Sequence, residues 1–351
     1  MILHVCGHLG KKGAGVFEVV KNLITFIPNS YAIGINDGEF DKKYILLRSF
    51  GPKNFNFNTK YLTKLFKLKP NHIHLHGLWL FNSIAVLLYK LCSPSTKIII
   101  SPHGMLSNET LKYNSILKKV FKLLIIDPLI RVCDFVHATS LDEAKKLKIL
   151  YPHSDIKIIE LGFSYHDYQN INFKKKRLLY LGRIHHVKGL DVLIEAWKNI
   201  HERFLDWDLY IVGQDENNTK AELEKFIKTN SVNNIFFKEP VYDLEKKYQI
   251  FSEASIYVLP SRHENFGLTV LEALYCKTPV ITTRNTPWQE INDKNCGECI
   301  ELDVASLEIS LTKFMSLSID ELKLLGINGH EWVLDNFDWK KIYKKFLYLY
   351  N

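Results

Sequence analysis

The stretch Ser255–Ile281 reads SIYVLPSRHENFGLTVLEALYCKTPVI and changes pattern twice. An apolar run, Ile256–Leu259, has the length of a buried strand, and Pro260 ends it. Apolar residues then recur at helical spacing over 266–274, before Val280 opens a second buried strand. The pattern predicts strand, turn, helix, turn and strand, the repeating unit of an α/β protein with a parallel sheet.

Two glutamates flank the start of the predicted helix. Glu264 lies in the turn at the carboxyl end of a strand, the edge at which open parallel sheets bind ligands. Gly267 marks the helix start, where backbone N–H groups can approach a ligand closely, and Glu272 follows inside the helix. Spacing alone favours a plainer interpretation, a solvated turn and a helix with exposed glutamates.

The same residues resemble the signature of family-4 glycosyltransferases, which are retaining enzymes of the GT-B fold. The resemblance rests on Glu264 and Glu272 with seven residues between them, including Phe266-Gly267-Leu268, and on Pro279-Val280-Ile281 after them. It implies an α/β fold of two Rossmann-like doubly wound domains facing a cleft. It also implies a C-terminal helix that crosses back to the N-terminal domain.

Length and composition agree with two domains. The chain has 351 residues, of which 46% are hydrophobic and 24% charged, as is ordinary for a globular protein. With the resemblance, we expect an N-terminal acceptor-side domain at 1–169, a nucleotide-sugar-binding domain at 170–336 and the crossing helix at 337–351. The N-terminus lacks the basic segment of a secretory signal, and no apolar run approaches the ~20 residues of a membrane span. We therefore expect a cytoplasmic protein.

Six cysteines are scattered along the chain, and Cys296 and Cys299 form a CxxC pair. A zinc site needs a second pair of ligands, and the sequence offers none at a suitable spacing. A redox pair would be expected near the first βαβ unit. We interpret all six cysteines as reduced thiols, as a cytoplasmic location favours.

A loop containing glycines follows the first predicted strand, residues 2–6. Gly13 and Gly15 precede a helical pattern over 16–27, and a glycine loop at a helix start can bind a phosphate. The GxGxxG fingerprint of dinucleotide-binding proteins is absent. In the resembled family the equivalent loop faces the distal phosphate of the donor and the acceptor, which makes both glycines candidate donor-binding residues.

Three histidines, His72, His74 and His76, alternate along one predicted strand and share one face. The strand rise spreads them over ~13 Å, too far for one metal ion to reach all three.

Another histidine, His103, follows the predicted strand 97–101 and is well placed to touch a ligand, although a lone histidine is more often structural. The sequence Pro102–Leu106, PHGML, resembles the family motif whose histidine lies beside the transferred sugar. The resemblance implies that His103 donates a hydrogen bond to that sugar.

Two cations follow the first predicted strand of the second domain, in the sequence GRIHHVKG. Arg183 and Lys188 lie at a strand-to-helix turn, where a fixed positive charge suits a phosphate. Two solvated cations are the plainer alternative. The spacing resembles the diphosphate-binding motif of the family, which assigns both residues to the leaving diphosphate.

Further residues join the site through the resemblance. Gly213 ends the predicted strand 207–212, and Val241 follows the next strand, where its backbone would contact the nucleotide base. Asp206 and Asp208 form a DxD, the metal motif of the other main glycosyltransferase fold. They stand at the start of a strand, opposite the ligand-binding edge. We expect no metal site and no cofactor besides the nucleotide-sugar donor.

The resemblance implies that a sugar moves from a nucleotide-sugar to an acceptor hydroxyl with retention at the anomeric carbon. Arg183, Lys188 and the amides of Phe266–Leu268 would stabilise the charge that grows on the diphosphate. Glu264 would bind hydroxyls of the sugar and Glu272 the ribose. The expected catalytic group is His103, Arg183, Lys188 and Glu264, and the expected donor-binding group is Gly13, Gly15, Gly213, Val241, Asn265, Phe266, Gly267, Leu268 and Glu272.

Two alternatives remain open. A sugar-nucleotide epimerase of the same fold would bind the donor and transfer nothing. A non-catalytic subunit of a polysaccharide assembly complex would need none of the charged motif residues, so their presence argues against it.

Positive charge is concentrated in the N-terminal half of the chain. Residues 1–168 carry 22 Lys and Arg against 12 Asp and Glu, a net charge of +10, whereas residues 169–351 have a net charge of −2. A basic N-terminal half suggests an anionic partner, or simply a lysine-rich surface that aids solubility. A nucleic-acid partner is less expected, because the sequence contains no nucleic-acid-binding motif.

The segment 111–126 interleaves apolar residues with Lys112, Lys118, Lys119 and Lys122. The pattern is typical of either a packed helix or a helix at a membrane surface. Polysaccharide enzymes of the resembled family often extend sugars carried on a polyprenyl diphosphate. We therefore expect a lipid-linked saccharide acceptor in lipopolysaccharide or capsule synthesis, with peripheral attachment at the inner face of the cell membrane.

Overall fold

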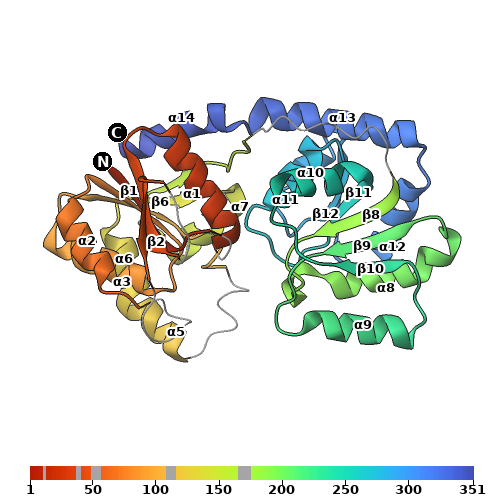
Figure 1. The fold of residues 1–351 in the computed structure, drawn as a ribbon, viewed down its shortest axis with the longest axis horizontal. Helices are drawn as coiled ribbons and strands as arrows, with labels where there is room; N and C mark the ends of the chain where they lie inside the picture. Colours follow the sequence, from red (N-terminus) through yellow and green to blue (C-terminus); the bar gives the residue numbers. More distant parts are fainter. Residues whose placement is uncertain (11–12, 37–40, 49–56, 108–115, 165–174) are drawn as a thin grey trace. The chain divides into compact units, whose positions relative to one another are not determined.

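The computed structural model describes residues 1–351 except 11–12, 37–40, 49–56, 108–115 and 165–174. Two compact units make up the chain (Figure 1): Met1–Ser164 with Trp339–Asn351, and Tyr165–Asp338. The expected boundary after residue 169 lies outside the described residues. Within those residues, every helix is too short or too polar to cross a membrane.

The N-terminal unit contains a parallel sheet of seven strands in the order β3-β2-β1-β4-β5-β6-β7. The strand order reverses between β1 and β4, and ligands of α/β proteins bind outside the carboxyl ends of the strands at such a point. The strands are β1 (Ile2–His8), β2 (Ser30–Ile35), β3 (Tyr44–Leu47), β4 (His72–His76), β5 (Lys97–Ser101), β6 (Phe135–Ala138) and β7 (Ile156–Ile158).

Helices cover both faces of this sheet (Figure 1). Because side chains alternate along a strand, Leu3 and Val5 of β1 enter a core with α2 and α3, while Cys6 enters a second core with α1. The helices are α1 (Ala14–Phe26), α2 (Lys60–Leu68), α3 (Phe81–Cys92), α5 (Ile116–Phe121), α6 (Asp127–Val132), α7 (Leu141–Leu150) and α14 (Trp339–Tyr350).

The last helix, α14, belongs to the N-terminal unit although it follows the C-terminal unit in the sequence. The backbone N–H of Trp339 donates to the carbonyl of Phe163 at 3.2 Å. A Cβ on Gly162 would lie 2.8 Å from the Trp339 ring, so this close approach requires glycine. Phe346 and Tyr350 are buried further along the helix.

The C-terminal unit contains a parallel sheet of six strands in the order β10-β9-β8-β11-β12-β13. Its order reverses between β8 and β11. The strands are β8 (Lys175–Leu181), β9 (Asp208–Val212), β10 (Ile235–Lys238), β11 (Ala254–Leu259), β12 (Val280–Thr283) and β13 (Gly297–Ile300). The helices are α8 (Leu190–Ile200), α9 (Thr219–Thr229), α10 (Leu244–Glu253), α11 (Leu268–Tyr275), α12 (Val304–Met315) and α13 (Ile319–Asn336).

Three helices follow β13, because a capping box of Ser318 and Glu321 starts α13 separately from α12. Two features differ from the sequence prediction. Gly15 lies inside α1, which begins two residues earlier than expected. The segment 111–126 is not one α-helix in its described part, since α5 ends at Phe121 and a π-helical turn, Lys122–Ile126, follows.

Candidate functional site

The carboxyl ends of the strands in the C-terminal unit carry most of the predicted donor-site residues. Arg183 follows β8, Gly213 follows β9, Val241 lies between β10 and α10, and residues 261–267 join β11 to α11. The strands β8 and β11 are neighbours at the point where the strand order reverses. The loops after them therefore occupy the usual ligand-binding position of an α/β sheet.

An ion pair joins these two loops. The Nζ atom of Lys188 lies 2.5 Å from Oε2 of Glu264, and the two side chains are only 12% and 16% exposed. The backbone also links the loops, because the N–H of Arg262 donates to the carbonyl of Val187 at 2.8 Å. The structure thus holds a cation and a carboxylate together at the ligand-binding edge.

Arg262 also joins these loops, although it is not among the site residues predicted from the sequence. Its guanidinium donates to both carboxylate oxygens of Asp191 at 2.7 and 2.6 Å and to the carbonyl of His186 at 2.8 Å. Burial alone would raise the pKa of Asp191, but the hydrogen bonds and charge of Arg262 outweigh it and lower that pKa. Both residues lie beside the quoted motifs, so their spacing was visible in the sequence and their pairing was not.

The second predicted phosphate ligand, Arg183, has a weaker partner. Its Nη1 lies 2.9 Å from Oε2 of Glu216, and the side chains are 60% and 37% exposed. Exposed pairs contribute roughly 0–1 kcal/mol. An anionic ligand can therefore replace Glu216 as the partner of Arg183 at little cost.

The start of α11 is built around Gly267. This residue has a φ of 80°, and a Cβ would lie 3.1 Å from both Glu264 Cγ and Trp288 Nε1. In the described residues no side chain caps α11, whose first residue is Leu268. Trp288 donates from Nε1 to the carbonyl of Phe266 and packs on its ring at 5.3 Å. The tryptophan therefore stabilises this loop through its contacts with Phe266. Asn265, another predicted donor-site residue, lies in the same loop between Glu264 and Phe266.

Glu272 has a partner that the sequence did not indicate. Its Oε1 lies 2.5 Å from Nζ of Lys247 on α10, and the two side chains are 11% and 21% exposed. Lys247 stands beside Lys246 on an ordinary amphipathic helix, so nothing in the sequence distinguishes it.

Gly213 has a packing role that is clear from the backbone. A Cβ at this position would lie 1.7 Å from the carbonyl oxygen of Gly182, so the ends of β8 and β9 could not approach. Its assignment to the donor site stays a prediction.

The DxD and CxxC pairs have structural explanations. Asp208 is the first residue of β9, and Asp206 forms an ion pair with Lys176, so both lie at the amino edge of the sheet as predicted. Cys296 and Cys299 are buried free thiols, and burial raises their pKa values to about 12 and about 11. Neither thiol is therefore ionised at neutral pH.

In the N-terminal unit, Gly13 stands at the first residue before α1. A Cβ there would lie 2.7 Å from the carbonyl oxygen of His8, and the N–H of Gly13 donates to Gly10 at 2.9 Å. Residues 11–12 of this loop lie outside the described residues. Gly15 lies in the first turn of α1.

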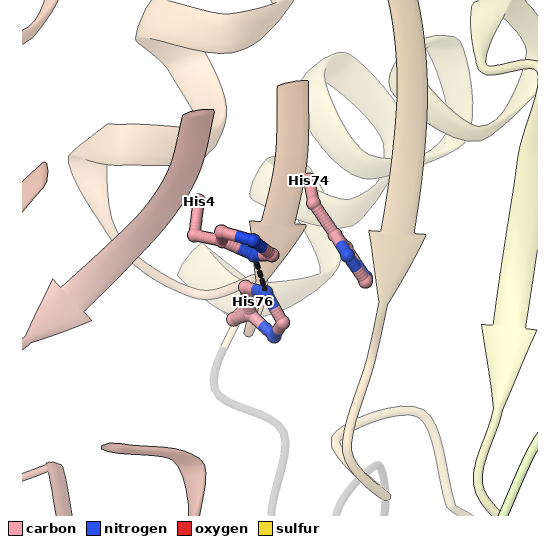
Figure 2. A group of neighbouring side chains, drawn as sticks. All are labelled: His4, His74 and His76. Atoms are coloured by element: carbon pink, nitrogen blue, oxygen red, sulfur yellow. Dashed lines mark hydrogen bonds between the residues drawn. The ribbon is translucent and has the colours of Figure 1, made fainter. Parts of the chain in front are cut away.

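His4, His74 and His76 are buried together on β1 and β4, and one nitrogen of each lies within 4.8 Å of the others (Figure 2). The sequence pattern groups His72 with His74 and His76, whereas the register of the sheet sets His4 directly opposite His74. Both nitrogens of His74 already have partners, Tyr350 Oη and Ser101 Oγ, at 2.6 Å each. A metal ion here would have to break one of these bonds, so the absence of a metal stays our prediction.

His103 follows β5 and belongs to the same group of histidines. The residue is partly exposed. Its φ of 52° is a left-handed backbone conformation, which is energetically unfavourable for residues other than glycine and is common at functional sites. Its Nε2 lies 3.1 Å from Nδ1 of His76. The loop is held by Glu143, which accepts from the N–H of Gly104 at 2.7 Å and from Thr139. Desolvation of the ring beside the other histidines, together with the charge of His137, lowers the pKa of His103 to about 3, so the ring is neutral.

Solved structures resemble the whole chain. The Anabaena protein Alr3699/HepE, in complex with UDP and glucose, has a TM-score of 0.79 over 99% of this chain and 98% of its own, at 14% identity. WaaG, a glycosyltransferase involved in lipopolysaccharide biosynthesis, has a TM-score of 0.73 over 98% of both chains, at 16% identity. The predicted fold class is confirmed: two Rossmann-like domains whose structural neighbours are GT-B glycosyltransferases.

Residues 164–331 match the family described as Glycosyl transferases group 1. Over 109 residues the chain is 35% identical to D-inositol 3-phosphate glycosyltransferase of Pseudarthrobacter chlorophenolicus. This aligned region covers 30% of this chain and 26% of the relative. The first two curated relatives are matched over only about a quarter of their own length. The family match over residues 164–331 includes Arg183, Lys188, Glu264 and Glu272, and it supports the group 1 family for the C-terminal half.

Proposed function

We propose that the protein is a retaining glycosyltransferase that moves a sugar from a nucleotide-sugar to a hydroxyl of a saccharide acceptor. The observation that carries the proposal is the Lys188–Glu264 pair at the carboxyl edge of β8 and β11, within the region that matches the family. A lysine there suits the leaving diphosphate, and a carboxylate beside it suits sugar hydroxyls. The UDP bound to the Anabaena neighbour supports a nucleoside diphosphate as the leaving group.

The chemistry assigned to these residues is electrostatic. As the bond between the anomeric carbon and the diphosphate breaks, negative charge grows on the phosphate oxygen that leaves. Lys188, Arg183 and the N–H groups at the start of α11 stabilise that charge, and the acceptor hydroxyl passes its proton to the same oxygen. Because the protein supplies the cations, we propose that transfer needs no metal ion.

A panel of radiolabelled nucleotide-sugars, assayed with a saccharide acceptor and with EDTA or Mg²⁺, tests this proposal. We expect sugar transfer from one donor at the same rate in both conditions. Interconversion of the nucleotide-sugar without transfer would identify an epimerase, and binding without turnover would identify a non-catalytic subunit. Loss of turnover in EDTA with recovery in Mg²⁺ would overturn the metal-independent mechanism.

Glu272→Ala is expected to weaken binding of UDP or another nucleoside diphosphate roughly tenfold, because this residue is assigned to the ribose. Glu264→Ala should leave that binding unchanged and slow transfer. Isothermal titration calorimetry measures the first effect. Lys247→Gln is the matched control, since it removes the ion pair and keeps the carboxylate of Glu272. The reverse pattern for the two glutamates would exchange their roles.

We further propose that the acceptor is lipid-linked, that the role is lipopolysaccharide or capsule synthesis, and that the protein attaches to the inner face of the cell membrane. WaaG, to which this chain is similar, is a glycosyltransferase involved in lipopolysaccharide biosynthesis, and this supports the lipopolysaccharide role. The described part of the segment 111–126 supports attachment, because it exposes large apolar side chains. These are Ile116, Leu117, Val120, Leu123 and Leu124, with exposures of 81%, 80%, 46%, 67% and 61%.

The lysines of this segment differ in their availability. Lys122 pairs with Asp127 at 2.6 Å, Lys118 lies over the Trp79 ring at 5.8 Å, and Lys119 is exposed. Lys112 lies outside the described residues. The apolar residues therefore become the main contact with lipid, and the net charge of +10 on residues 1–168 favours an anionic surface.

Leu117→Ser with Leu123→Ser and Leu124→Ser is expected to reduce binding to vesicles containing anionic lipid at least tenfold. Partial burial of each leucine in the bilayer contributes on the order of 1 kcal/mol. Co-sedimentation at low and high salt measures the effect. The control is Leu205→Ser, which is 72% exposed and belongs to the C-terminal unit. If wild-type protein stays in the supernatant at low salt, attachment through this segment is wrong.

A further inference from the structure

Two chains of hydrogen bonds run through the histidines of the N-terminal unit, and the direction of the first is determined by a carbonyl. His137 Nε2 lies 2.8 Å from the carbonyl oxygen of Ile159, which only accepts, so this nitrogen carries the proton. Its Nδ1 then accepts from Ser101 Oγ, which accepts from His74 Nε2, and His74 Nδ1 accepts from Tyr350 Oη. All four hydrogen bonds of this chain can form together only with the protons in this one arrangement.

The second chain contains three imidazoles in series. His4 Nδ1 lies 3.0 Å from His76 Nε2, as the dashed line in Figure 2 marks, and His76 Nδ1 lies 3.1 Å from His103 Nε2. A neutral imidazole carries one proton, so the tautomer of one ring determines the tautomers of the other two. Burial lowers all three pKa values, and neighbouring histidines lower those of His76 and His103 further, which keeps the rings neutral.

The end of the second chain decides its direction. His4 Nε2 is fully buried and has no hydrogen-bond partner among the residues that the structure describes. If the protons point away from His103, this atom is an unpaired N–H donor; if they point toward His103, it is an unpaired acceptor. Among backbone groups, buried N–H donors without a partner are rarer than under-satisfied acceptors, and we apply the same preference to these ring nitrogens. The second arrangement gives His4 Nδ1–H to His76, His76 Nδ1–H to His103, and a remaining proton on His103 Nδ1.

We propose that His4 and His76 are positioning residues that hold His103 as its Nδ1–H tautomer, so that the ring presents a hydrogen-bond donor at the carboxyl edge of the sheet. That this donor binds an oxygen of the transferred sugar rests on the proposed function. The tautomer of His103 is independent of the proposed function. In this arrangement His103 has no lone pair at Nδ1 and does not serve as a general base there.

Long-range ¹H–¹⁵N correlation spectra of ¹⁵N-histidine-labelled protein without ligand test the proposal at neutral pH. We expect Nδ1–H signals for His103, His76 and His4 and Nε2–H signals for His74 and His137, with His103 assigned through its loss in His103→Gln. An Nε2–H signal for His103 in wild-type protein would overturn the proposal whether or not transfer is observed. Transfer failing in the donor panel while these tautomers hold would instead overturn the proposed function.

Variants separate positioning from packing. His76→Asn keeps an amide donor near the position of Nδ1 and should preserve the His103 tautomer, whereas His76→Phe should leave His103 as a mixture. His76→Phe should also lower kcat roughly threefold to tenfold with an unchanged donor KM. His74→Gln is the matched control, since His74 is equally buried and stacks on His76 at 4.1 Å without joining the chain. A mixed His103 tautomer in His74→Gln would show that general packing, and not His76, sets the ring.

Discussion

At about pH 5 the N-terminal unit is expected to lose most or all of its stability. Five histidines in or beside its sheet, His4, His74, His76, His103 and His137, have pKa values well below the ordinary value of 6.5, chiefly because of burial. Between their folded pKa values and 6.5, the unfolded chain binds protons that the folded chain does not. Stability therefore rises with pH in this window and is lost as the pH falls below about 6.5.

The size of the effect depends only on the unfolded state, provided that the folded rings stay neutral. At about pH 5 each such histidine costs about 2 kcal/mol, and five cost about 10 kcal/mol, which equals the whole stability of a typical domain. Tyr350 and Glu160 also act on these histidines. Burial keeps the Tyr350 hydroxyl protonated, and the Glu160 carboxylate raises the pKa of His137 less than burial lowers it.

Urea unfolding at pH 7.5, 6.0 and 5.0 measures this loss, and hydrogen exchange assigns it to residues 1–164. We expect a slope of about 5–7 kcal/mol per pH unit near pH 5, from about 1.4 kcal/mol for each proton taken up. His153→Ala, at an exposed position of the same unit, should leave the slope unchanged. A flat stability between pH 7.5 and pH 5.0 would mean that the histidines are charged or hydrated in the folded protein.

The sequence predicted the elements well because their signals are local. The strand 97–101 has the expected bounds, and the loops after β8 and β11 stand at the ligand-binding edge as expected. Their order along the chain follows from buried runs, turn residues and helical spacing, all of which act within about 15 residues.

The pairs within the site could not be predicted in the same way. The bond between His74 and Tyr350 joins residues 276 positions apart, and the contact of His4 with His76 depends on the register of β1 against β4. Neither register nor long-range packing is encoded in the spacing of the histidines. Lys247 likewise finds Glu272 only because α10 packs against α11.

Lys188→Ala is expected to lower kcat/KM for the nucleotide-sugar roughly ten- to a hundredfold. The ammonium would make a charge-assisted bond to the leaving diphosphate, worth ~1.5–3 kcal/mol, and that bond strengthens as charge grows in the transition state. The decrease should therefore appear mainly in kcat. Arg183→Ala should act in the same direction, because Arg183 is assigned to the same diphosphate.

The pairing with Glu264 makes a single variant ambiguous, since Lys188→Ala leaves a mostly buried carboxylate without its cation. Glu264→Gln alone and combined with Lys188→Ala completes a double-variant cycle, because the single variant measures what loss of the carboxylate costs by itself. If Lys188→Ala lowers kcat no further in the Glu264→Gln background, the loss in Lys188→Ala came from the isolated carboxylate. Lys313→Ala, which breaks an exposed pair with Glu298 elsewhere in the unit, is the control and should keep normal kinetics. Wild-type kcat/KM in Lys188→Ala itself would remove the diphosphate assignment, and with it the observation on which the proposed function rests.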